Sequence, residues 1–78
     1  MKTFRGREWI RQGNWYSLAG TEIRVYQWNS GSRANFLVTA GFRQSTHIER
    51  SFAYGPEART AAIEYALSLR EKYPRKGY

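Results

Sequence analysis

The sequence predicts an α+β domain in which an antiparallel sheet of three strands, or four, packs on one C-terminal α-helix. A chain of 78 residues has room for a single domain over 1–78. Its 41% hydrophobic and 17% aromatic content argues against intrinsic disorder. Apolar residues alternate singly over much of 14–55, which is typical of strands, and recur every three or four positions over 56–73, which is typical of a helix.

Residues 1–13 form an N-terminal arm or an extra strand. Residues 4–11 and 14–18 fit two strands, or one strand interrupted by a glycine, and a short helix over 6–11 is a third alternative. If the segment is a strand, four side chains share one side: Arg5, Arg7, Trp9 and Arg11. If the segment serves the fold rather than binding, Trp9 and its neighbour Ile10 belong to the core.

Residues 22–28 predict a strand with two different faces. Ile23 and Val25 point to one side, and the alternate residues point to the other. That other side carries one basic and two aromatic side chains: Arg24, Tyr26 and Trp28. Residues 29–32 have turn chemistry, so we expect a hairpin to a second strand over 34–42. One face of that strand carries Phe36, Val38, Ala40 and Phe42.

A second turn over 43–46 leads to a third strand over 47–54, whose Phe52 we expect to meet the helix. Which residues of this strand face the helix stays open, because the charged Arg50 shares a side with the apolar Ile48 and Phe52. Either Arg50 is partly buried or a bulge intervenes.

The helix is predicted over 56–73. Pro56 suits a first helical position, Arg70 and Lys72 suit the last turn, and Pro74 prevents continuation. One apolar stripe, rich in alanine, runs along it: Ala58, Ala62, Tyr65, Ala66 and Leu69. Because alanine is small, we expect the helix to lie close to the sheet.

The charge is strongly positive and unevenly distributed. Thirteen basic and six acidic residues give a formal net charge of +7, and ten of the basic residues are arginines. Residues 1–55 carry +5, residues 56–73 are balanced, and residues 74–78 form a short tail of +2. Such an excess favours an anionic partner, and arginine in particular fits phosphates and guanine edges with two parallel hydrogen bonds.

If the helix covers one sheet face, the other face carries arginines and aromatic rings into solvent. Arg24, Tyr26 and Trp28 would offer cations and stacking surfaces together. The alternative is a second apolar cluster in which these rings pack under the N-terminal segment and the stem of Arg24 covers them. Arg33 and Arg43, at the two turns, are natural phosphate anchors.

The composition excludes several kinds of chemistry. Without cysteine the chain has no disulfide, thiol nucleophile or cysteine-based zinc site. With one histidine and no aspartate, a metal centre or hydrolytic triad has almost nothing to be built from. His47 with Glu49 is the one hint of acid–base chemistry, and neither a third group nor a pocket is indicated. We therefore expect no enzyme, cofactor or metal.

No apolar run approaches the ~18 residues of a membrane span, and no leader pattern opens the sequence. The predicted helix over 56–73 is electrically balanced, which does not suit a membrane surface. We expect a soluble, cytoplasmic protein without a membrane partner, associated with the nucleoid if it binds DNA.

Short motifs at both ends resemble the ethylene-response-factor-type DNA-binding domain, whose architecture the arm-binding domains of tyrosine integrases share. They are Phe4-Arg5-Gly6, Gly13-Asn14-Trp15, the stretch from Phe52 to Ala58, and the stretch from Ala61 to Tyr65. The resemblance implies a three-stranded sheet inserted in the DNA major groove and a role in transcription regulation, a mobile element or a phage. It places Arg7, Trp15 and Arg24 nearest the DNA, while residues 17–41 lengthen the hairpin region beyond the family pattern.

The expected function is therefore non-enzymatic binding of nucleic acid, with double-stranded DNA first, on the sheet face opposite the helix. The expected contacts are Arg5, Arg7, Trp9, Arg11, Trp15, Arg24, Tyr26, Trp28, Arg33 and Arg43. Two alternatives use the same face: binding of RNA or single strands, and docking of an acidic protein by a small phage-type inhibitor or adaptor.

Overall fold

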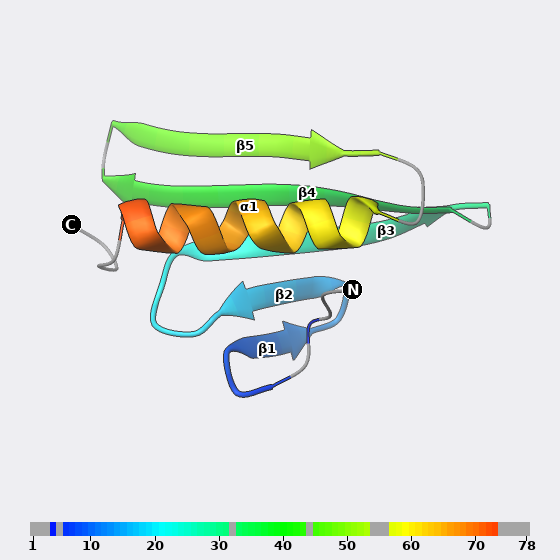
Figure 1. The fold of residues 1–78 in the computed structure, drawn as a ribbon, viewed down its shortest axis with the longest axis horizontal. Coiled ribbons are helices and arrows are strands. Elements are labelled where there is room, and N and C mark those ends of the chain that lie inside the picture. The colour runs from blue at the N-terminus through cyan, green and yellow to red at the C-terminus, as the bar shows by residue number, and fades with distance from the viewer. Residues whose placement is uncertain (1–3, 5, 32, 44, 54–56, 74–78) are drawn as a thin grey trace.

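The described residues form five strands and one helix, arranged as Figure 1 shows. The computed structural model describes residues 4, 6–31, 33–43, 45–53 and 57–73, with the backbone alone for Ser30 and Arg43. The elements are β1 (Trp9–Gln12), β2 (Trp15–Leu18), β3 (Ile23–Ser30), β4 (Arg33–Arg43), β5 (Thr46–Phe52) and α1 (Ala58–Lys72). The α+β class is confirmed, but the sheet has five strands, so the prediction of three or four was wrong. The expected tail over 74–78 lies outside the described residues.

The sheet is an antiparallel meander in which each strand pairs with the next, in the order β1-β2-β3-β4-β5. Gly13 and Gly31, with φ of +64° and +67°, adopt the left-handed conformation in the turns after β1 and β3. Pairing of β3 with β4 continues to Ser30 opposite Arg33, so the ladder extends into the residues expected to form the turn.

The first twenty residues form a hairpin that extends one edge of the sheet. β1 begins at Trp9, after turn residues, and pairs with β2 from Trp9 opposite Leu18 to Gln12 opposite Trp15. The alternatives of a helix over 6–11 and of one interrupted strand are therefore wrong. Each strand has only four residues, too few for alternation to be recognised in the sequence.

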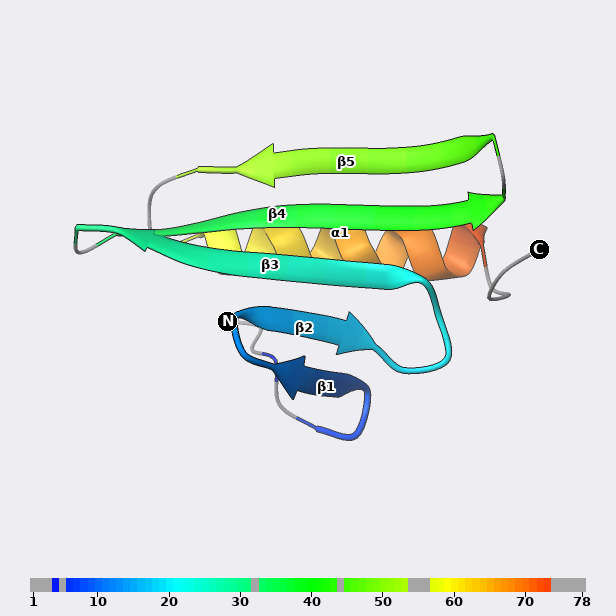
Figure 2. The same ribbon diagram turned by 180° about the vertical axis from the view of Figure 1, so that it is seen from behind.

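The helix lies along β3 and β4 and also contacts β5 (Figure 1). It begins at Ala58, two residues after the predicted start, with Glu57 as its N-cap, and ends where the N–H of Tyr73 donates to the carbonyl of Leu69 (2.7 Å). Five of its residues are buried: Ala58, Ala62, Ile63, Ala66 and Leu69. None of the described helices or strands covers the opposite sheet face, as the view from behind in Figure 2 shows.

The main core lies between α1 and the near face of the sheet. The sheet contributes Leu18, Ile23, Val25, Phe36, Val38, Ala40 and Phe42, all at most 2% exposed. This confirms the predicted faces of the strands over 22–28 and 34–42. Packing large apolar side chains from the sheet against small ones from the helix is what stabilises a domain of this size.

Side chains of β5 alternate between the helix side and the open side of the sheet, as they do in β3 and β4. Arg50 pairs with Val38 and so lies on the helix side, where its guanidinium carbon is 5.3 Å from the ring centre of Phe52 and 5.0 Å from that of Tyr65. Phe52 lies against Tyr65 at 5.7 Å, which confirms that it meets the helix. The irregularity in pairing occurs at Gly41 and Arg43 rather than within β5. Arg50 therefore covers rings at the edge of the core.

A smaller aromatic cluster covers the helix side of the β1–β2 hairpin. Phe4 stacks on Tyr16 at 4.0 Å and meets Trp9 edge-on at 5.0 Å. An ion pair of 2.8 Å between Arg70 Nη1 and Glu8 Oε2 links the end of α1 to the turn before β1. Both side chains are largely exposed, so the pair adds little stability by itself. The hairpin thus lies beside the helix and leaves the other sheet face open.

We expect Ala62→Leu to lower the free energy of unfolding by about 1–3 kcal/mol, because Ala62 is fully buried against the sheet and a larger side chain would force the helix away. Ala61→Leu is the matched control, since Ala61 is only half-buried. Urea denaturation followed by circular dichroism measures both. Equal stability of the two variants would contradict the close helix packing.

Candidate functional site

Three aromatic side chains form a continuous row on the open face of the sheet. Trp15 lies opposite Tyr26 across β2 and β3, and Trp28 follows Tyr26 on the same side of β3. The ring centres of Trp15 and Tyr26 are 4.8 Å apart, and those of Tyr26 and Trp28 are 5.7 Å apart with nearly parallel planes. Both tryptophans are 37% exposed. We call Trp15, Tyr26 and Trp28 the aromatic ladder.

The register confirms the predicted orientation of residues on β3. Val25 pairs with Val38 in the core, so its neighbours Arg24 and Tyr26 must face away from α1. The alternative in which these rings pack beneath the N-terminal segment is wrong, because that segment extends the sheet edge instead.

Neighbouring residues complete the open face. Leu37 lies opposite Tyr26 and Asn35 opposite Trp28 across the β3–β4 ladder. Asn35 is only 4% exposed, whereas Ile10, on the same side of β1, is 51% exposed. The expectation that Ile10 belongs to the core was therefore wrong. Sequence reasoning also missed Asn35, because its burial depends on the partner strand.

The charges on this face are mostly positive. Over β1–β4, the described side chains that face away from the helix include Arg24 and Arg33 and no carboxylate. Four glutamates lie on or beside the helix: Glu8, Glu57, Glu64 and Glu71. Glu22 lies between β2 and β3, and Glu49, opposite Thr39, is on the open face of the edge strand β5, two strands away from β3. An anion approaching the aromatic ladder therefore meets guanidinium groups rather than carboxylates.

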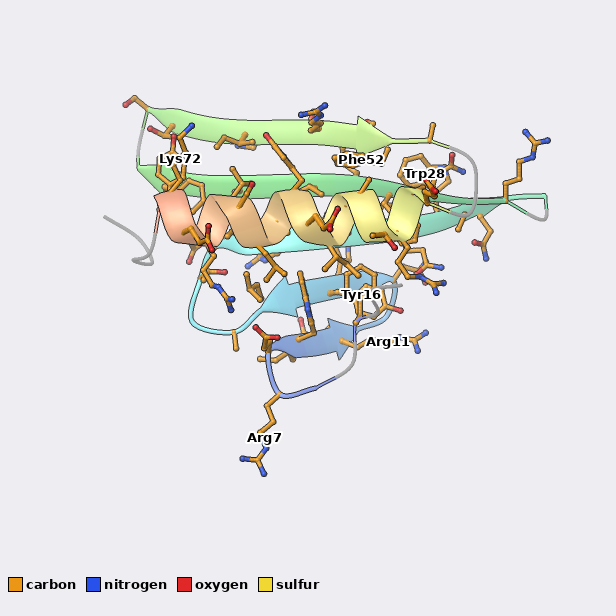
Figure 3. The ribbon with its side chains drawn as sticks, in the orientation of Figure 1. Arg7, Arg11, Tyr16, Trp28, Phe52 and Lys72 are labelled. Carbon is orange, nitrogen blue, oxygen red and sulfur yellow. The ribbon has the colours of Figure 1, made fainter. Side chains whose placement is uncertain are left out.

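The predicted N-terminal row forms only in part: Trp9 and Arg11 share one side of β1, which is the helix side, and Arg7 lies outside the strand. Trp9 is 8% exposed and belongs to the core, so its ring is not available to a partner. Arg7 lies in the turn before β1 and points away from the sheet, as Figure 3 shows. Arg11 lies on the helix side of β1. Two other predicted contacts, Arg5 and the side chain of Arg43, lie outside the described residues. Trp15, Arg24, Tyr26, Trp28 and Arg33 are the predicted contacts that share the open face.

A hollow of about 380 Å³ lies where the β1–β2 turn meets β3. Figure 3 shows Arg11, Tyr16 and Trp28 at this end of the sheet. Its lining is polar apart from the rings: Arg11, Gly13, Asn14, Tyr16, Gln27, Trp28 and Asn29. The sequence did not reveal this hollow, because three strands bring its residues together.

The predicted acid–base pair lies on the edge strand. His47 Nε2 and Glu49 Oε2 are 3.9 Å apart on β5, and their side chains are 71% and 59% exposed, so no cavity surrounds them. The same part of the chain contains no cluster of three metal-ligating side chains and no helix long and apolar enough to cross a membrane.

No protein-family model, curated protein or solved structure matches this chain. The segments that resemble the ethylene-response-factor-type domain lie at the β1–β2 turn, at the end of β5 and in α1. The resemblance implies three strands, whereas the sheet has five.

We expect the three tryptophans to differ in solvent access. A variant that retains only Trp9, with Trp15→Phe and Trp28→Phe, should emit at shorter wavelength and be quenched less by acrylamide than one that retains only Trp28. The reason is that Trp9 is 8% exposed and Trp28 is 37% exposed. Equal quenching would contradict the assignment of Trp9 to the core.

Proposed function

We propose that this protein binds single-stranded nucleic acid on the open face of its sheet, without catalysing a reaction. The observation that supports this most is the aromatic ladder, which lies on a sheet face without a covering layer. Bases stack on the ladder, and Arg24 and Arg33 contact the phosphates.

Stacking suits this surface because every base has an aromatic face, whatever its sequence. Sheets with exposed aromatic side chains bind splayed bases of single strands in this way. Tyr26 has a ring neighbour on each side, so the exposed surfaces of Trp15 and Trp28 at the two ends of the ladder are the places for bases.

The electrostatics favour a polyanion over an apolar partner. The chain carries a formal net charge of +7, and no described carboxylate shares the face of β1–β4 with the ladder. Arginine can form two parallel hydrogen bonds with a phosphate. Arg24 is exposed on the same strand as Tyr26 and Trp28, so cation and rings reach the same ligand.

The width of the sheet favours a single strand over a duplex groove. Neighbouring strands are about 4.8 Å apart, so five strands span about 19 Å. The DNA major groove is about 12 Å wide and admits a helix or a two-stranded ribbon. A three-stranded sheet, as in the ethylene-response-factor-type domain, is narrower. The two additional strands therefore make this sheet less suited to the groove.

Duplex DNA remains the second candidate because of one feature, the outer end of the β3–β4 hairpin. β2 pairs with β3 only as far as Tyr26, and β5 pairs with β4 only as far as Phe36. Beyond these residues the hairpin projects as a two-stranded ribbon (Figures 1 and 2). Such a ribbon fits a major groove, and Trp28 and Arg33 lie on it.

We expect Trp15→Ala to weaken binding of a short single-stranded oligonucleotide by about 1–3 kcal/mol, because one stacking surface is lost. Ile10→Ala is the control, since it removes an exposed apolar side chain without a ring from the same face. Fluorescence anisotropy measures both affinities, and circular dichroism verifies folding. The proposal fails if the two substitutions have the same effect.

We expect Arg24→Ala to weaken binding and to make the slope of log affinity against log salt less negative by about 0.7, the value for one single-strand phosphate. Arg50→Ala removes the same charge from the helix side and should leave the slope nearly unchanged. Competition with duplex DNA separates the two candidates. Preference for the duplex, with Arg33→Ala as the most damaging change, would favour the projecting ribbon. Absence of binding to any oligonucleotide would contradict both candidates.

A further inference from the structure

The hollow between the β1–β2 turn and β3 is suited to a polar ligand. Its volume of about 380 Å³ lies within the range of about 300–1,000 Å³ usual for small-molecule sites. Five of the seven lining residues have polar side chains or a phenol hydroxyl, and none is a carboxylate. The ligand should therefore be anionic and should form hydrogen bonds.

Three side-chain amides around the hollow are uncommitted. Asn14, Gln27 and Asn29 form no side-chain hydrogen bond with any residue that the structure describes. The backbone holds two of them together, because the N–H of Gln27 donates to the carbonyl of Asn14 (2.9 Å). Each amide has both donors and an acceptor, which is the pattern that base edges complement.

Arg11 is held in position at the same hollow. Its Nε donates to the carbonyl of Gly13 (3.2 Å), and its guanidinium carbon lies 5.8 Å from the ring centre of Tyr16. The described residues place no carboxylate against it. A guanidinium oriented in this way has its terminal nitrogens free for a phosphate.

Trp28 connects the hollow to the aromatic ladder. Its ring lies at one end of the ladder on the open face, and the residue also lines the hollow. Four other lining residues, Arg11, Tyr16, Gln27 and Asn29, lie on the helix side, so a strand would pass from the ladder to the hollow around the edge of β3 that β2 leaves unpaired beyond Tyr26. We propose that the hollow binds one nucleotide of the strand, with its phosphate on Arg11 and its base edge on the amides. This inference rests on the proposed function and adds to it a site that discriminates between bases.

The first experiment uses the whole chain labelled with ¹⁵N and titrated with each of the four nucleoside monophosphates. We expect the side-chain amide resonances of Asn14, Gln27 and Asn29 to shift. Arg11→Ala should lower the affinity obtained from these shifts about tenfold or more. Arg50→Ala is the matched control, because this arginine also lies on the helix side and over an aromatic ring, away from the hollow. Inorganic phosphate is titrated in parallel.

The second experiment measures base preference with single-stranded oligonucleotides of one base type each. Replacing Gln27 and Asn29 together by alanine should bring the affinities for the different base types to within about twofold of one another. The reason is that a bidentate amide contact supplies most of the discrimination between bases. Trp15→Ala should weaken binding of every oligonucleotide and leave the shifts caused by monophosphates unchanged.

Three results would overturn the nucleotide site: no amide shifts with any monophosphate, equal shifts with inorganic phosphate, or equal effects of Arg11→Ala and Arg50→Ala. Amide shifts with monophosphates in a protein that binds no oligonucleotide would support the nucleotide site and overturn the proposed function. The two proposals can therefore fail separately.

Discussion

The close packing of α1 on one face of the sheet determines the rest of the structure. Ala58, Ala62 and Ala66 turn toward the sheet and are at most 7% exposed, so no bulky helical side chain separates the two layers along this line. Large side chains from β3 and β4, such as Phe36 and Phe42, fill the space between them. A chain of this length builds one such core, and the second sheet face is left without cover.

The placement of the N-terminal hairpin follows from the same core. The helix covers β3, β4 and part of β5, so the helix side of β1 and β2 needs another cover. Phe4 supplies it by stacking on Tyr16 and meeting Trp9 edge-on. The hairpin therefore buries its apolar residues on the helix side and cannot fold back over the aromatic ladder. The open face becomes wider without becoming buried.

The division of charge between the two sides suits a polyanionic ligand. Most glutamates lie on or beside the helix, where Glu8 pairs with Arg70. Arginines are present on both sides, so the open face is distinguished less by the number of its cations than by the scarcity of carboxylates. Arg11 shares the helix side of β1 with Trp9, as predicted, and lines the hollow rather than the open face.

The sequence alone determined the elements with clear periodicity: the alternating faces of β3 and β4, the helix to within two residues, and the orientation of Arg24, Tyr26 and Trp28. These features depend on local spacing, which the chain carries at every position. Only the tertiary structure decided the number of strands, the burial of Trp9 and the hollow around Arg11. Each of these depends on pairing between segments distant in sequence, and strands of four residues have too little periodicity to reveal it.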